Sequence, residues 1–216
     1  MVGRVVVGKK IDALYSIVDK ETLIARGGRV DDFARELRDA GVTLLQYRDK
    51  SGAPQEILRA AAEIAAVFAG IEATLILNDR ADLAVLAGWS GVHVGHLDLP
   101  PDAVRRVLGV GRVIGVSTHN DEQMREADAG EANYVAVGPV FATSTKLNAE
   151  PVVGLEGVRR ARELTAKPIV AIGGITRANA RAVIEAGADS VAVIGGLFSD
   201  GERSGKVARD FLELLG

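Results

Sequence analysis

Cysteine is absent from the 216-residue chain, which excludes a disulfide framework, a thiolate metal site and a cysteine nucleophile. An excess of positive charge is also absent, since the formal net charge is −3. The chain therefore lacks the basic field of a nucleic-acid-binding protein. No apolar run reaches the ~18 residues of a membrane-spanning helix, and residues 1–16 show no signal-peptide pattern. We expect a cytoplasmic protein without nucleic-acid or membrane partners.

The composition is that of an ordinary globular protein, with 48% hydrophobic and 25% charged residues. Neither a linker nor a low-complexity segment divides the chain. The length favours one domain over residues 1–216.

Eight short, nearly continuous apolar runs recur along the chain, which is typical of strands buried on both faces of a parallel sheet. The predicted strands are Tyr15–Val18, Val42–Gln46, Thr74–Leu77, Gly91–Val94, Val113–Val116, Tyr134–Val137, Ile169–Ile172 and Val191–Ile194.

Segments with helical periodicity separate these runs. Val30, Phe33 and Leu37 form one apolar stripe of this kind. Helix starts are predicted at Pro54, Pro101 and Thr176. Eight alternating units predict an α/β fold, a single-domain (β/α)8 TIM barrel. An open doubly wound sheet is the alternative, but Asp19-Lys20-Glu21 after the first strand is not its Gly-rich fingerprint. In either fold, functional residues gather at the carboxyl ends of the strands.

Cations follow the second strand. Alternation places Gln46, Arg48 and Lys50 on one side, where they would form an anion clamp; a solvated charged loop is the alternative. Lys146 ends a hydroxyl-rich loop after the sixth strand, and we expect it to join this clamp.

Two carboxylates follow the third and fourth strands. Asp79 and Asp98 are candidate oxygen ligands for Mg²⁺, or alternatively a helix cap and a turn residue. Ser117 and His119 follow the fifth strand. The serine would donate to a phosphate oxygen or begin the next helix, and the histidine would be a general base or a structural imidazole.

Paired glycines at 173–174 and 195–196 follow the last two strands. Glycine lets backbone N–H groups approach a ligand, and phosphate at these two strands is a recurrent barrel feature. The residues therefore predict a barrel enzyme that holds two phosphate-bearing groups.

A series of motifs occurs in order along the chain: QYRDK (46–50), LNDR (77–80), GVHVGHLDLP (91–100), IGVSTH (114–119), YVAVGPVFATSTK (134–146), PVVGLEG (151–157) and PIVAIGGIT (168–176). From Tyr15 to about Phe198, this ordered set resembles the thiamine-phosphate synthase family.

The resemblance implies a transferase that joins a pyrimidine diphosphate to a thiazole phosphate, or to its carboxylated form, through a pyrimidine carbocation. It implies that Asp79 and Asp98 bind Mg²⁺. The residues implied to hold the pyrimidine diphosphate are Gln46, Arg48, Lys50, Asn78, Ser117 and Lys146, of which Arg48, Lys50, Ser117 and Lys146 are expected to act in catalysis. Those implied to hold the thiazole phosphate are Thr143, Thr145, Gly174, Ile194 and Gly195.

The chain departs from the family pattern at His96, where glutamine is frequent, at Gly195, where serine is frequent, and at Tyr47, where leucine is usual. Two other functions stay open: a thiazole tautomerase of the same superfamily, in which His119 would be the acid–base group, and a non-catalytic barrel that binds a phosphate ligand. A homo-oligomer is possible.

Overall fold

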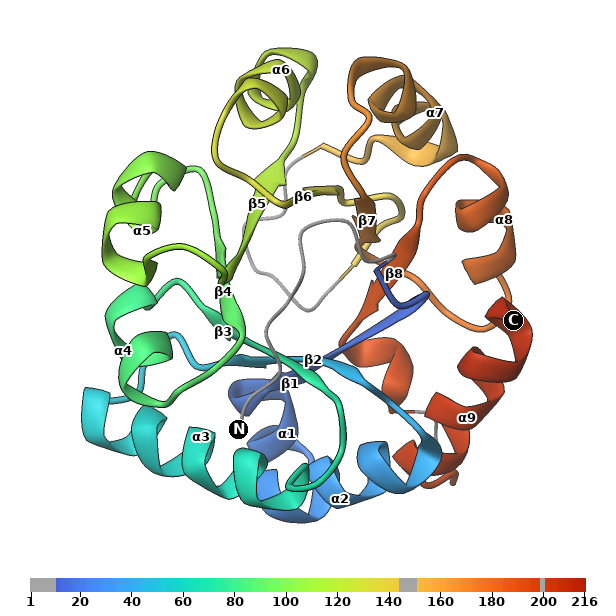
Figure 1. The fold of residues 1–216 in the computed structure, drawn as a ribbon. Helices are drawn as coiled ribbons and strands as arrows, with labels where there is room; N and C mark the ends of the chain where they lie inside the picture. Colours follow the sequence, from blue (N-terminus) through green and yellow to red (C-terminus); the bar gives the residue numbers. More distant parts are fainter. Residues whose placement is uncertain (1–10, 144–150, 199–200) are drawn as a thin grey trace.

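The computed structural model describes residues 11–143, 151–198 and 201–216. Parallel strands pair in sequence order and close into a barrel, with the last strand beside the first (Figure 1). The predicted TIM barrel is thereby confirmed, whereas one domain over residues 1–216 stays a prediction. The strands are β1 Leu14–Asp19, β2 Leu44–Arg48, β3 Thr74–Asn78, β4 Gly91–Val94, β5 Val113–Thr118, β6 Tyr134–Val137, β7 Ile169–Ile172 and β8 Ser190–Val193.

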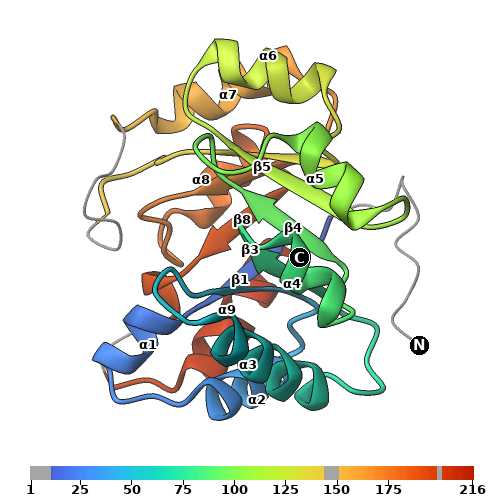
Figure 2. The same ribbon diagram turned by 90° about the vertical axis from the view of Figure 1, so that its left-hand side faces the viewer.

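Helices surround the barrel on its outside, as the turned view in Figure 2 also shows. The predicted stripe on α2 is seen, because Phe33 and Leu37 are buried and Val30 packs against the same core. The helices are α1 Lys20–Ala25, α2 Val30–Ala40, α3 Pro54–Val67, α4 Ala81–Leu86, α5 Pro101–Leu108, α6 Asp121–Ala129, α7 Gly154–Leu164, α8 Ala180–Glu185, η1 Gly195–Leu197 (a 3-10 turn) and α9 Ser204–Leu215.

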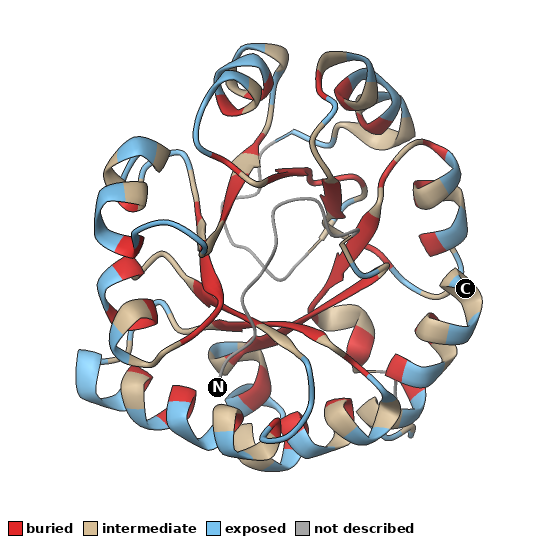
Figure 3. Cartoon of the chain, viewed as in Figure 1, coloured by how far each residue is buried: buried red, intermediate tan, exposed pale blue. Residues whose placement is uncertain are grey.

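Two hydrophobic cores lie on the two faces of the strands, which are buried over most of their length (Figure 3). Outward residues such as Leu14 and Val18 of β1 pack with the helices. Inward residues fill the barrel: Tyr15, Ile17, Leu44, Ile76, Tyr134, Ala136, Val170, Ala192 and Ile194. Alternation along each strand therefore decides which residues can reach the barrel axis.

The structure corrects several of the sequence-based assignments. The second strand begins at Leu44 and continues through Arg48, because Arg48 pairs with Asp19 in the β1–β2 ladder. An additional helix, α1, follows the first strand. The last predicted helix start, Thr176, is wrong: Asn179 accepts a hydrogen bond from the Thr176 N–H (2.8 Å) and donates one to the Gly174 carbonyl (3.1 Å). These bonds hold a turn, so α8 begins only at Ala180.

Within the described residues, no helix is long and apolar enough to cross a membrane.

The inner core leaves no room for a side chain at Gly115 of β5. A Cβ there would lie 2.0 Å from the Tyr134 ring. We predict that Gly115→Ala lowers the free energy of unfolding by about 1–3 kcal/mol, because overpacking displaces the ring. Urea denaturation measures this loss. In a Tyr134→Leu background, which removes the clashing atoms, the same substitution should cost less. An equal loss in both backgrounds would show that this contact does not constrain Gly115.

Candidate functional site

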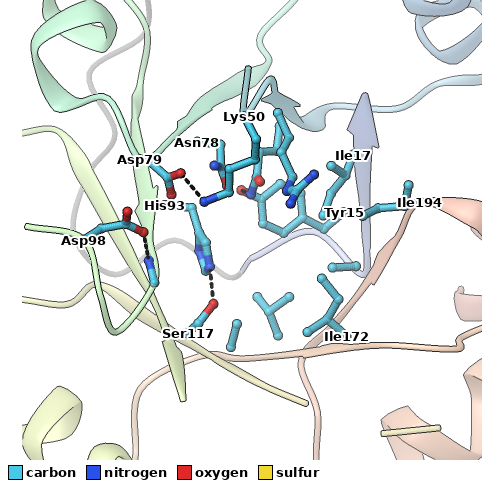
Figure 4. A pocket seen from close by; sticks show the side chains of 16 residues that line it. Tyr15, Ile17, Lys50, Asn78, Asp79, His93, Asp98, Ser117, Ile172 and Ile194 are labelled. Atoms are coloured by element: carbon cyan, nitrogen blue, oxygen red, sulfur yellow. Dashed lines mark hydrogen bonds and ion pairs between the residues drawn. The ribbon is translucent and has the colours of Figure 1, made fainter. Parts of the chain in front are cut away.

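Two adjoining cavities open at the carboxyl ends of the strands. The smaller, of about 70 Å³, lies at the barrel axis (Figure 4). The larger, of about 650 Å³, lies over the ends of β6, β7 and β8. The residues that line both are Ser117, Ala136, Ile172, Ala192 and Ile194. Two ligands bound in these cavities would therefore meet across a shared wall.

The smaller cavity brings together the three residues predicted to share one side of the second strand. Gln46, Arg48 and Lys50 all line it. Arg48 forms an ion pair with Asp19, whose side chain is only 3% exposed. Asp19 also caps α1, accepting from the Thr22 backbone N–H (2.9 Å) and hydroxyl (2.6 Å). Arg48 is thus fixed at the cavity wall by a buried carboxylate.

Asp79 follows β3 in a left-handed conformation (φ 60°). Asp and Asn adopt this conformation more readily than other side chains. The backbone N–H of Asp79 donates to the His93 carbonyl (2.8 Å), which ties the end of β3 to β4. Its carboxylate accepts from Lys50 Nζ at 2.5 Å. Burial raises the pKa of Asp79, the Lys50 ammonium opposes this, and the adjacent Asp98 carboxyl raises the pKa further.

Asp79 does not cap a helix, so this alternative prediction is wrong, whereas Asp98 does lie in a turn that its side chain stabilises. The N-cap of α4 is Arg80, without a side-chain hydrogen bond. The Asp98 carboxylate accepts from the Gly95 N–H (2.8 Å) and closes a turn after β4. That turn also carries it toward Asp79, so both carboxylates line the smaller cavity (Figure 4).

Two neighbouring carboxylates fit a hard divalent cation. Over the part of the chain that the structure describes, no third acidic or histidine side chain completes a protein-only cluster. Mg²⁺ commonly takes one or two carboxylates and completes its shell with water and substrate phosphates. The pair therefore suits a cation that is held jointly with a phosphorylated ligand.

A chain of hydrogen bonds crosses the barrel beneath these charged groups. It runs from Gln46 Nε2 to Tyr15 OH, Tyr134 OH, His93 Nδ1 and, through His93 Nε2, to Ser117 Oγ; each distance is 2.9 Å. Sequence reasoning did not identify Tyr15 and Tyr134 as members of this chain. Their inward register, two residues before Ile17 and Ala136, is the signal that could have identified them.

One direction in this chain is fixed. An amide nitrogen can only donate, so the Tyr15 hydroxyl accepts from Gln46 Nε2. The chain links the hydroxyl of Ser117, which lines the cavity, to the two buried tyrosines through the imidazole of His93.

Asn78 also lines the smaller cavity, and its amide nitrogen is buried with no hydrogen-bond partner among the described residues. A buried donor without a partner is costly and marks a position where a ligand acceptor would bind.

The larger cavity is lined by the glycine pairs that follow β7 and β8 and by Thr143. A Cβ at Gly174 would lie 2.5 Å from the Ala142 carbonyl oxygen, and one at Gly196 would lie 2.4 Å from that of Ile175. Only glycine allows this close approach of backbone segments. Ile194 and Gly195 line the cavity as expected.

The two remaining histidines differ in position. His119 lines the larger cavity and donates from Nδ1 to the Gly138 carbonyl (2.7 Å), which fixes its tautomer. His96 is exposed and lines neither cavity. Thr145 and Lys146 lie outside the described residues.

A parallel barrel with cations, paired carboxylates and a glycine-lined cavity at its strand ends belongs to the class of enzymes that act on phosphorylated small molecules. A family model described as "Thiamine monophosphate synthase" matches residues 14–197. The chain belongs to this family.

Individual relatives agree with this assignment. The chain is 50% identical to the thiamine-phosphate synthase of Koribacter versatilis, covering 96% of this chain and 98% of that protein. It is 35% identical to the thiamine-phosphate synthase of Methanosarcina mazei, covering 96% and 84%. The solved structure of the thiamine phosphate pyrophosphorylase from Pyrococcus furiosus superposes with a TM-score of 0.82 at 29% identity, covering 94% and 95%.

The tyrosines give the first test of the buried hydrogen-bond chain. Burial raises the pKa of Tyr15, Tyr134 and Tyr47, the only three tyrosines. The unfolded chain releases tyrosine protons above about pH 10 while the folded chain retains them, so stability should fall as pH rises past about 10. Absorbance at 295 nm and circular dichroism should therefore change together during an alkaline titration. A tyrosine that ionises near pH 10 with the circular dichroism intact would contradict this burial.

Proposed function

We propose that the chain condenses 4-amino-2-methyl-5-hydroxymethylpyrimidine diphosphate with hydroxyethylthiazole phosphate to give thiamine phosphate and diphosphate. With the carboxylated form of the thiazole, the carboxylate leaves in addition as carbon dioxide. The observation that carries this proposal is the pair of adjoining cavities, each with its own set of anion-binding groups, which meet at a shared wall. Membership of the family supports it.

The smaller cavity would hold the pyrimidine diphosphate. Arg48 and Lys50 supply positive charge, and Ser117, whose hydroxyl is held by His93 Nε2, lines the same cavity. The Asn78 amide offers an unused donor, and Gln46, whose Nε2 already binds Tyr15, fixes the floor. Lys146 stays part of this proposed clamp by family resemblance.

Asp79 and Asp98 would hold Mg²⁺ at the diphosphate. When bound, the ion neutralises charge that develops on the leaving diphosphate. Lys50 already contacts Asp79, so cationic charge and carboxylates sit at the same edge of the cavity. A diphosphate there would meet Lys50 and Arg48 in a preorganised arrangement.

The chemistry needs no protein nucleophile. The C–O bond between the pyrimidine methylene and the diphosphate breaks, and its electron pair leaves with the diphosphate. The ring amino group delocalises the resulting positive charge on the methylene. Ile17, Val170 and Ile172 give the cavity apolar walls that would limit access of water to the cation. The thiazole nitrogen then donates its electron pair to the methylene carbon.

The thiazole phosphate would bind in the larger cavity. Backbone groups at Gly174, Ile194 and Gly195 line it together with Thr143, and Thr145 is added by family resemblance. Because Gly195 carries no hydroxyl, its contact with the phosphate would be made by the backbone.

The two other functions are not favoured. A tautomerase has no need of a diphosphate clamp, and a non-catalytic barrel would not account for curated synthases at 50% and 35% identity. A cytoplasmic location, the lack of nucleic-acid partners and a possible homo-oligomer stay predictions from the sequence.

The Mg²⁺ ligands can be tested with Asp79→Asn and Asp98→Asn, which keep the shape but remove the charge. We expect normally folded proteins whose Mg²⁺ requirement rises by on the order of tenfold or more, measured as thiamine phosphate formed against Mg²⁺ concentration. Asp82→Asn is the matched control, because Asp82 is exposed and its ion pair with Arg80 lies outside both cavities. Full wild-type activity in excess EDTA would contradict the metal role.

Lys50→Ala tests the diphosphate clamp. The side chain is 45% exposed, so its loss should leave the urea midpoint near the wild-type value. It should lower kcat/KM for the pyrimidine diphosphate roughly tenfold or more, as expected for a charged hydrogen bond. Arg48→Ala is a poorer probe, because it leaves the buried Asp19 unpaired. Lys206→Ala, which removes another carboxylate-paired lysine far along the chain, is the control; equal kinetics for Lys50→Ala and Lys206→Ala would reject the clamp.

A further inference from the structure

Helix α1 and the residue that follows it contribute a wall to the larger cavity, through Thr22 and Ala25 of the helix and through Arg26. We propose that Arg26 binds the phosphate group of the thiazole substrate. This inference rests on the proposed function and adds a residue that the sequence motifs did not identify.

The Arg26 guanidinium has a defined position. Its central carbon lies 4.9 Å from the centroid of the Phe198 ring. Phe198 in turn stacks on Phe33, with centroids 5.0 Å apart and an interplanar angle of 11°, and Phe33 is only 5% exposed. This cation–π contact uses the charge of the guanidinium and leaves its N–H donors available for a ligand.

The backbone before and after Arg26 also restricts it. The Arg26 N–H donates to the Leu23 carbonyl (3.1 Å) at the end of α1. The Gly28 N–H returns to the same carbonyl (3.0 Å), and a Cβ at Gly28 would lie 2.4 Å from the Leu23 side chain. This tight turn places Arg26 at the cavity wall.

Arg26 differs in charge from the other described residues that line the larger cavity. Of the described residues that line it, Arg26 is the only arginine or lysine, and none is an acid. Its guanidinium forms no ion pair or side-chain hydrogen bond within residues 11–143, 151–198 and 201–216. Arg48 and Lys50, in contrast, already pair with Asp19 and Asp79. A phosphate dianion held only by backbone N–H groups would lack a compensating charge, and Arg26 is placed to supply it.

The position favours the phosphate over the carboxylate of a carboxylated thiazole. Phe198 directly follows η1, whose first residues are Gly195 and Gly196. Arg26 therefore contacts the residue that follows the segment whose backbone is proposed to bind the phosphate, and it lines the same cavity as Gly195 and Gly196. Two parallel N–H donors of a guanidinium can bind two oxygens of one phosphate group at the same time.

The test uses Arg26→Gln, which keeps a polar stem but removes the charge, in the full chain with Mg²⁺ and saturating pyrimidine diphosphate. We expect KM to rise roughly tenfold or more for both thiazole phosphates, with little change in kcat. The inhibition constant of inorganic phosphate against thiazole phosphate should rise in parallel, while that of the unphosphorylated thiazole alcohol should not change. Arg26→Lys should restore part of the affinity. Arg59→Gln on the exposed face of α3 is the control.

Three results would overturn the proposal. A KM that rises only for the carboxylated thiazole would assign Arg26 to the carboxylate. An equal loss for the alcohol would assign it to packing of α1, and unchanged constants would remove it from the site. Failure of the proposed function can be distinguished from failure of the Arg26 contact. If the proposed function is wrong, the wild type forms no thiamine phosphate. Calorimetric measurement of thiazole phosphate binding to the wild type and to Arg26→Gln would then still test the contact.

Discussion

The closed barrel imposes one constraint on which the site depends: every second residue of each strand points to a narrow axis. Tyr15 and Tyr134 both point there, and their hydroxyls meet at 2.9 Å. Gly115 supplies the space that the Tyr134 ring occupies. The filled lower part of the barrel forms a floor, and the hydrogen-bond chain in it holds the Ser117 hydroxyl at the cavity above.

The distribution of charged side chains divides the carboxyl-terminal end of the barrel into two regions. At the ends of β2 to β4, the smaller cavity carries both cationic side chains (Arg48 and Lys50) and carboxylates (Asp79 and Asp98). This combination suits a diphosphate accompanied by a divalent cation. At the β7–β8 side, glycine backbone lines a larger space with Arg26 as its cation. Bound anions would thus be separated across the wall formed by Ala136 and Ile194, with the organic parts of the two substrates facing each other.

Regular periodicity made most of the fold predictable. Eight apolar runs gave the strand number, and alternation put Gln46, Arg48 and Lys50 at one cavity. Residues fixed by long-range contacts could not be predicted. The left-handed backbone of Asp79 depends on β4, and Arg26 is placed by Phe198, far away in the sequence. The helix start at Ala180 depends instead on a local turn that the Asn179 side chain holds. The family motifs named candidate ligands, whereas the tyrosine chain required the register between strands.

The central claim is that two phosphorylated substrates occupy two adjoining cavities. A crystal structure of the chain with thiamine phosphate, inorganic diphosphate and Mg²⁺ tests it most directly. The account predicts diphosphate within hydrogen-bonding distance of Arg48, Lys50 and Ser117, with the metal on Asp79 and Asp98. It predicts the thiamine phosphate group at Gly174 and Gly195. Both phosphorus-containing groups in one cavity, or a metal away from the two carboxylates, would contradict it.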